Sequence, residues 1–168
     1  NIPLEEKLPE TIRPAEVGVK VDNLTFGYTE ETVLENVSLD IKPGEFVAII
    51  GESGVGKTTL IRLMMSFMSN MQGNVSFYNA YGESVPTNAG VREFLAYVPQ
   101  GNTLFSGTVR ENIRMGNLSA TEEEMLDALK LSAGYDFVMG LPNGLDTVIG
   151  ERGHGLSEGQ AQRIAIAR

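Results

Sequence analysis

The sequence G-E-S-G-V-G-K-T at residues 51–58 decides how this chain folds. An apolar segment, residues 46–50, precedes it, and the turn-forming sequence K-P-G-E lies ahead of that segment at residues 42–45. After the glycine-rich stretch, apolar side chains recur at helical spacing at Leu60, Ile61, Met64, Met65, Met68 and Met71. A buried strand, a glycine-rich turn and an amphipathic helix in this order predict an α/β fold built around the turn.

The glycine-rich stretch has the chemistry of a phosphate-binding loop. Gly51, Gly54 and Gly56 permit backbone conformations that turn successive N–H groups toward one point, and a triphosphate would sit in that cradle. Lys57 is placed to reach the outer phosphates, and the Thr58 hydroxyl is placed to coordinate Mg²⁺. The helix that follows would add roughly half a positive charge at its N-terminus. The predicted phosphate-binding residues are Gly51, Glu52, Ser53, Gly54, Val55, Gly56, Lys57, Thr58 and Thr59.

The composition excludes several classes of protein. With 168 residues and 42% hydrophobic content, the chain can bury one ordinary core. It has no cysteine and one histidine, so we expect no disulfide, thiolate metal site or zinc cluster. No apolar run approaches the roughly 18 residues of a membrane-spanning helix, so we expect the isolated chain to be soluble. The net charge of −9 and the lack of a basic stretch argue against nucleic acid as a partner.

Changes in the sequence pattern divide the chain into segments. Residues 1–16 contain prolines among acidic residues and are predicted to form an extended linker. Strands are predicted at residues 19–26, 37–41, 74–79 and 91–98. The methionines of the helix after the phosphate loop are interpreted as core packing rather than as a soft-metal site. Thr121 and Glu124 have the spacing of a capping box, which predicts a helix from there to about residue 131.

A second motif, L-S-E-G-Q at residues 156–160, resembles the signature L-S-G-G-Q of the ATP-binding cassette (ABC) family. Tyr28 resembles the aromatic residue that stacks on adenine in that family, and Gln100 in Y-V-P-Q resembles the Q-loop glutamine. The segment T-L-F-S-G-T-V-R-E-N-I from Thr103 is similar to the version found in exporters. T-V-I-G-E-R-G at residues 147–153 resembles an exporter loop that contacts membrane-domain helices. The resemblance covers residues 17–168 in family order.

The resemblance implies the ATP-binding domain of an exporter, which powers transport by ATP-driven dimerisation and hydrolysis. The implied fold is α/β, a P-loop NTPase core with an N-terminal antiparallel β-subdomain and a helical subdomain, incomplete at the C-terminus. Residues 1–16 would be the linker from a preceding membrane domain. Residues 17–101 would form the ATP-binding core, and residues 102–168 the helical subdomain with the signature motif.

The implied ligands are ATP and Mg²⁺, with Thr58 and Gln100 as metal ligands. Ser157, Gly159 and Gln160 would bind the γ-phosphate held by the phosphate loop of a second nucleotide-binding domain, in a homodimer or a heterodimer. The other implied partner is the transmembrane domain of the same transporter. That domain would hold the chain at the cytoplasmic face of the cell membrane.

These residues also have purely structural interpretations. Tyr28 is equally explained as a packing residue at the end of a strand, and Gln100 as an amide that caps a loop. Ser157 and Gln160 have the spacing of a capping box at the start of a helix. Glu158 replaces the usual glycine of the signature, and its carboxylate either leans back along the helix or weakens the grip on phosphate.

Residues that would carry hydrolysis are absent from the sequence. Hydrolysis needs one carboxylate for the Mg²⁺ shell and another for the attacking water. The resemblance places both on a strand after the signature helix, followed by a switch histidine. His154 comes too early to be that histidine and is interpreted as an ordinary loop residue. No catalytic residue is therefore identified, and the chain alone is predicted to be inactive, and to be destabilised or completed by a partner.

Two alternative functions stay open at this point. One is a non-transport ABC protein of DNA maintenance or translation, which would have a basic surface. The other is a nucleotide-binding fragment that does not hydrolyse ATP.

Overall fold

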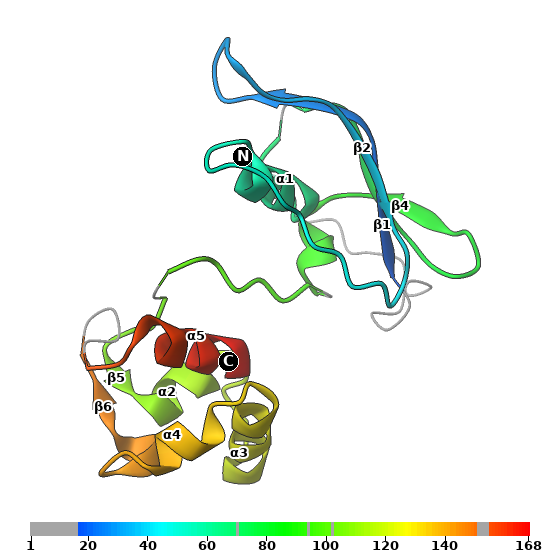
Figure 1. The fold of residues 1–168 in the computed structure, drawn as a ribbon. Coiled ribbons are helices and arrows are strands. Elements are labelled where there is room, and N and C mark those ends of the chain that lie inside the picture. Colours follow the sequence, from blue (N-terminus) through cyan, green and yellow to red (C-terminus); the bar gives the residue numbers. More distant parts are fainter. Residues whose placement is uncertain (1–16, 70, 94, 102, 151–154) are drawn as a thin grey trace, which may run out of the picture. The chain divides into compact units, whose positions relative to one another are not determined.

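The computed structural model describes residues 17–69, 71–93, 95–101, 103–150 and 155–168. These residues form two compact units that divide between Ala96 and Tyr97, and each unit is described by itself (Figure 1). The predicted linker at residues 1–16, His154 and the last part of the exporter-like loop, residues 151–153, lie outside the described residues.

The first unit is built on a four-stranded antiparallel sheet with the order β2-β1-β3-β4. Its strands are β1 (Gly18–Gly27), β2 (Thr32–Ile41), β3 (Gln72–Tyr78) and β4 (Ser84–Pro86). In β1 the side chains of Val21, Leu24 and Phe26 are all buried, although strict alternation from Val21 would turn Leu24 and Phe26 outward. Asn23 adopts a φ of +49° and shifts the register between Val21 and Leu24. The predicted antiparallel β-subdomain is confirmed.

Helix α1 (Lys57–Met64) follows the phosphate loop and packs on the sheet through Leu60 and Leu63 (Figure 1). The helix is shorter than its apolar spacing predicts, because Ser66 adopts a φ of +53° and ends it. Arg92 stabilises this end, since its Nε donates to the Met65 carbonyl at 3.1 Å and its Nη2 to the Ser66 carbonyl at 2.5 Å. Met64, Met68 and Met71 still pack against the core, so the interpretation of the methionines as packing residues is confirmed.

Two predicted strands are wrong. Residues 46–50 form no strand, and the side chains of Phe46 and Ile50 are 98% and 91% exposed. Among the described residues no strand lies beside this segment, and an extended segment without a neighbour has no ladder of backbone hydrogen bonds. At residues 91–98 the strand is replaced in part by the 3₁₀ helix η2 (Ala89–Glu93). Asn88 starts this turn, because its side-chain oxygen accepts from the Gly90 amide at 2.8 Å.

The second unit is mainly helical. It contains α2 (Val109–Arg114), α3 (Glu122–Leu131), α4 (Tyr135–Met139), the 3₁₀ helix η3 (Gly144–Asp146) and α5 (Glu158–Ala167). A short antiparallel pair joins β5 (Gly107–Thr108) to β6 (Val148–Ile149). The core comes from buried apolar residues of these elements, among them Val109, Ile113, Met125, Leu129, Val138 and Ile164. The predicted helical subdomain is confirmed.

Capping boxes start three of the described helices in this unit. Thr108 with Glu111 starts α2, Thr121 with Glu124 starts α3, and Ser157 with Gln160 starts α5. The second and third confirm their sequence patterns, and the first was missed. The hydrogen bonds from the threonine amide and hydroxyl lower the pKa of both glutamates, which keeps the carboxylates charged at the positive ends of the helices.

Asn112 holds the loop before α2 in place. It is 1% exposed, its Oδ1 accepts from the Phe105 amide at 2.9 Å, and its Nδ2 donates to the carbonyls of Phe105 at 3.0 Å and Thr108 at 2.9 Å. A buried side chain with three hydrogen bonds to backbone explains why an asparagine stands in this segment. Its place in the sequence gave no sign of this role.

We expect Asn112→Ala to lower the free energy of unfolding of the second unit by about 2–3 kcal/mol, because it removes three hydrogen bonds between a buried side chain and partly buried backbone groups. Chemical denaturation followed by circular dichroism measures the loss. Asn117→Ala is the matched control, since Asn117 is exposed and its Oδ1 accepts from the amide and the hydroxyl of Ser119, at 3.1 Å and 2.8 Å. The control should lose about 0.5 kcal/mol or less, and equal losses in the two variants would contradict the role of Asn112.

Candidate functional site

The phosphate loop closes around the side chain of Lys57. The Nζ of Lys57 donates to the Gly51 carbonyl at 2.8 Å and to the Glu52 carbonyl at 2.6 Å. The ammonium therefore lies inside the loop, where it faces the loop carbonyls. A bound polyphosphate would offer the same ammonium a stronger, charged acceptor.

Two glycines shape the loop. Gly54 has a φ of +88° and Gly56 a φ of +97°, both in the region that favours glycine. A Cβ on Gly56 would lie 2.7 Å from Cδ2 of Leu34, so an added side chain would have to displace that leucine. Gly56 is the N-cap of α1, and no side chain caps that helix. The N-terminal amides of α1 can therefore donate to a bound ligand, and these residues fit a polyphosphate.

Tyr28 lies beside the first turn of α1. Its hydroxyl is 3.1 Å from Oγ1 of Thr59, and its ring meets Phe26 edge to face, with centroids 5.2 Å apart and an interplanar angle of 83°. The side chain is 57% exposed, so an aromatic ligand has access to the ring. The structure thus brings Tyr28 to the phosphate loop, from a position 31 residues away in the sequence.

The second group of predicted residues lies in the second unit. The Oγ of Ser157 accepts from the Gln160 amide at 3.2 Å, and Oε1 of Gln160 accepts from the Ser157 amide at 2.9 Å. The structural interpretation of this pair as a capping box is confirmed, and their phosphate contact stays a prediction. A Cβ on Gly159 would meet nothing within 4 Å, so this first turn of α5 is open. Gln100 is exposed and lies next to Gly101, which has a φ of +90°.

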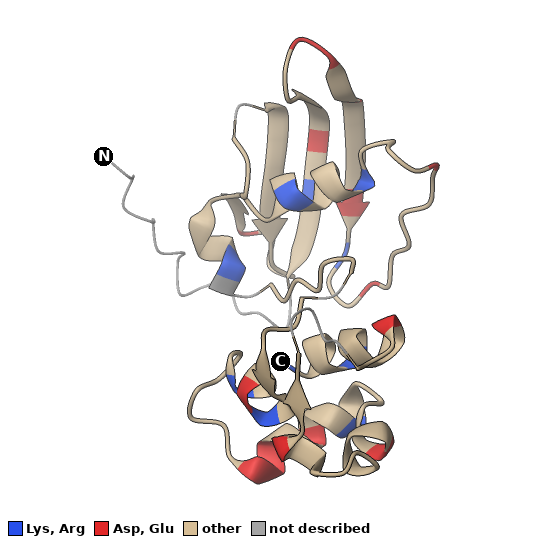
Figure 2. Ribbon diagram, turned by 90° about the vertical axis from the view of Figure 1, so that its left-hand side faces the viewer, with Lys and Arg blue, Asp and Glu red and all other residues tan. Residues whose placement is uncertain are grey.

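The described residues contain no group of three His, Cys, Asp or Glu side chains that could hold a metal ion. Thr58 is exposed at the start of α1, where its hydroxyl could ligate a cation carried by the phosphates. None of the described helices is long and apolar enough to cross a membrane. Basic and acidic residues are interspersed along the ribbons of both units (Figure 2).

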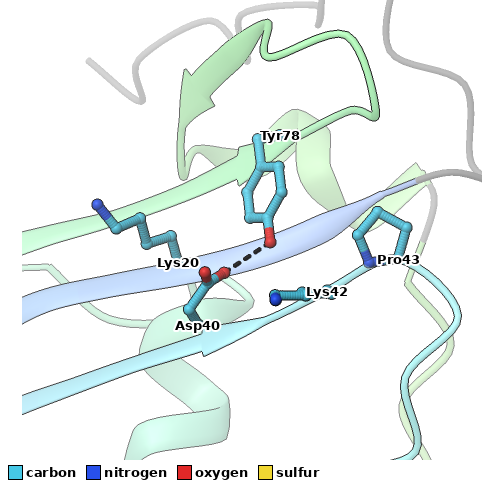
Figure 3. A pocket seen from close by; sticks show the side chains of 5 residues that line it. All are labelled: Lys20, Asp40, Lys42, Pro43 and Tyr78. Atoms are coloured by element: carbon cyan, nitrogen blue, oxygen red, sulfur yellow. Dashed lines mark hydrogen bonds between the residues drawn. The ribbon is translucent and has the colours of Figure 1, made fainter.

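A separate hollow of about 450 Å³ lies at the end of the sheet, lined by Lys20, Asp40, Lys42, Pro43 and Tyr78 (Figure 3). The Tyr78 hydroxyl donates to Oδ1 of Asp40 at 2.6 Å, and Lys20 forms an ion pair with Asp22 at 3.3 Å. No predicted nucleotide-binding residue lines this hollow. The hydrogen bond to Asp40, together with burial and the nearby charges of Asp40 and Glu45, raises the pKa of Tyr78 to about 12.

This shift predicts a loss of stability in alkali. Unfolded chains release the tyrosine proton near pH 10, whereas folded chains hold it until the pH reaches about 12. The contribution of Tyr78 is therefore complete below pH 10 and is lost as the pH rises through 12. Tyr78→Phe should unfold with a weaker dependence on pH in this range, measured by denaturation at a series of pH values. Tyr81→Phe, at an 85% exposed tyrosine, should keep the wild-type dependence, and equal pH profiles for Tyr78→Phe and wild type would contradict the prediction.

Known proteins resemble this chain in sequence and fold. The family model for ABC transporters matches residues 34–168. A Haemophilus influenzae protein named "Probable ABC transporter ATP-binding/permease protein" is 40% identical over 152 residues, which are 89% of this chain and 27% of that protein. A Staphylococcus aureus protein, provisionally named a multidrug export ATP-binding/permease protein, is 41% identical over 152 residues, which are 89% of this chain and 26% of that protein.

A solved structure is also similar to this chain. A bacterial Atm1-family ABC exporter with ATP bound matches with a TM-score of 0.83 and 35% sequence identity, over 99% of this chain and 28% of that one. The chain thus spans just over a quarter of the length of these relatives, at 26–28%.

Proposed function

The chain belongs to the ABC transporter family, and on that premise we propose that it is the ATP-binding domain of an exporter. The observation that carries the proposal is the phosphate loop, in which two left-handed glycines precede a helix that begins with Lys57 and has no side-chain cap. An aromatic ring lies beside that helix, as a nucleotide with an aromatic base requires. The ligand is therefore ATP rather than an inorganic polyphosphate.

Each residue of the loop has a role in this proposal. Lys57 exchanges its two loop carbonyls for phosphate oxygens, and the backbone amides of residues 51–59 hold the remaining charge. Thr58 would ligate the Mg²⁺ that accompanies the nucleotide, and Tyr28 would stack on the adenine. Gln100, in the second unit, stays the other proposed metal ligand. Stacking of a base on an aromatic side chain is worth about 1–3 kcal/mol.

A second nucleotide-binding domain is the proposed partner. Ser157, Gly159 and Gln160 lie at the exposed, positive end of α5, and they would contact the nucleotide held by the partner's phosphate loop. ATP binding would then close two domains on each other, and hydrolysis would reopen them. The relatives are ATP-binding/permease proteins, which supports a transmembrane domain in the same transporter and a place at the cytoplasmic face of the membrane.

We also propose that this chain alone does not hydrolyse ATP. Its sequence offers no evident carboxylate for the attacking water, and the described residues contain no acidic metal-binding group. Binding and turnover are therefore separate questions for this chain.

Isothermal titration of the chain with ATP and Mg²⁺ tests the main proposal, and phosphate release from the same samples tests the second. We expect binding without turnover. A chain that binds no ATP would contradict the nucleotide-binding function. Turnover that disappears in Lys57→Met would contradict the proposed lack of hydrolysis, because a contaminating ATPase would not respond to that substitution.

A further inference from the structure

The ring of Tyr28 is held at two points and open to solvent elsewhere. Its edge-to-face partner Phe26 is 6% exposed, and its hydrogen-bond partner Thr59 is 7% exposed, so both supports are buried. Tyr28 as a whole residue is 57% exposed. An exposed tyrosine on a loop normally samples several rotamers, whereas this one has its ring against Phe26 and its hydroxyl bonded to Thr59.

The backbone at this position is also constrained. Gly27 ends β1, and a Cβ there would lie 2.3 Å from the Glu31 carbonyl oxygen. The chain therefore turns tightly at residues 28–31, directly after Gly27, and Tyr28 is the first residue of this turn. Thr59 lies two residues after Lys57 in the same helix, so one short helical segment carries both the loop lysine and the support of the ring.

We propose that the Thr59 hydroxyl is a positioning group for Tyr28. Its hydrogen bond holds the tyrosine ring at the distance from the phosphate loop at which the base of a bound nucleotide lies. This rests on the proposed nucleotide-binding function and adds the device that makes the site selective for a polyphosphate with an aromatic base. A ring held in place before binding loses less side-chain freedom when the base stacks on it. The hydrogen bond between the Tyr28 and Thr59 hydroxyls therefore contributes to the affinity for ATP. It has no such effect on the affinity for tripolyphosphate, because that ligand has no base.

The test is a double-mutant cycle of Tyr28→Phe and Thr59→Val, with Thr59→Ser as the conservative variant. For each variant of the chain, titration calorimetry gives the affinities for ATP and for inorganic tripolyphosphate, and their ratio is the readout. Tyr28→Phe keeps the ring and removes its hydroxyl, so the ratio should fall about threefold to tenfold. Thr59→Val should lower the ratio by a similar factor, and the double variant should fall no further than either single one. Thr59→Ser keeps the hydroxyl and should retain the wild-type ratio.

A direct contact of Thr59 with phosphate would change the affinities for ATP and for tripolyphosphate by the same factor. Such a contact therefore leaves their ratio unchanged. Thermal unfolding of each variant shows whether a loss comes from misfolding, which would also lower both affinities. Additive losses in the double variant, or a Thr59→Ser ratio equal to that of Thr59→Val, would overturn the positioning role.

Failure of the proposed function has a different signature. Tyr28→Ala removes the ring and should abolish the preference for ATP over tripolyphosphate. If wild type binds no ATP, or prefers ATP no more than Tyr28→Ala does, both the function and the positioning role are wrong. If wild type prefers ATP and Tyr28→Ala does not, but the cycle is additive, only the positioning role fails.

Discussion

Lys57→Met is expected to lower the affinity of the chain for ATP by a factor of about 10 to 150. Hydrogen bonds to charged groups are worth about 1.5–3 kcal/mol, which converts to that range. In the free chain the Lys57 ammonium already points at the Gly51 and Glu52 carbonyls at 2.8 Å and 2.6 Å, so no reorganisation of the chain is needed to bring it into the loop. Methionine keeps the length of the side chain without the charge, and titration calorimetry measures the change.

Lys42→Met is the matched control for this prediction. It changes the net charge by the same single unit in the same unit of the protein, but Lys42 lines the separate hollow and not the phosphate loop. Because exposed charges are screened in physiological salt, the affinity should stay within about twofold of wild type. Equal losses in the two variants would mean that the general field of the protein, rather than the ammonium in the loop, attracts the nucleotide.

Gly56→Ala is expected to lower the free energy of unfolding of the first unit by about 2–5 kcal/mol and to abolish ATP binding. The left-handed backbone, with a φ of +97°, costs an alanine about 1–2 kcal/mol. The added Cβ would also lie 2.7 Å from Leu34 and 3.2 Å from Val33, and overpacking of this kind costs about 1–3 kcal/mol more. Since Leu34 belongs to the core of the sheet, the strain reaches beyond the loop. Chemical denaturation and titration with ATP measure the two effects.

Gly54→Ala separates the cost of the left-handed backbone from the cost of the contact with β2. Gly54 has a φ of +88°, but a Cβ there would meet nothing within 4 Å. The substitution should therefore carry the conformational cost alone, about 1–2 kcal/mol. A Gly54→Ala variant as unstable as Gly56→Ala would show that the contact with β2 does not matter.

Local sequence patterns predicted those parts of the molecule that depend on neighbours in the chain. The capping boxes at Thr121 and Ser157 need only residues three positions apart, and both formed. The turn at residues 42–45 formed as well, with Gly44 at a φ of +75° and the Glu45 amide bonded to the Lys42 carbonyl at 3.1 Å. The phosphate loop is of the same kind, because its glycines and its lysine all lie between residues 51 and 57.

Features that depend on distant residues could not be predicted. Apolar content indicates that a segment is buried, but it does not show whether a partner strand lies beside it. Residues 91–98 were therefore predicted to form a strand, whereas Val91 is buried as part of the 3₁₀ helix η2. The hydrogen bond between Tyr28 and Thr59 joins residues 31 apart, and Arg92 reaches the end of α1 from 26 residues away. Such contacts arise only when the whole unit is assembled.

The segment at residues 46–50, which has no neighbouring strand among the described residues, affects how the protein behaves in solution. A short apolar stretch outside a sheet is a template for pairing between molecules, and Phe46 and Ile50 are almost fully exposed. The isolated chain should therefore precipitate or form oligomers as its concentration rises, and titrations are best made with dilute protein. Light scattering before and after a Phe46→Lys substitution would show whether this stretch limits solubility.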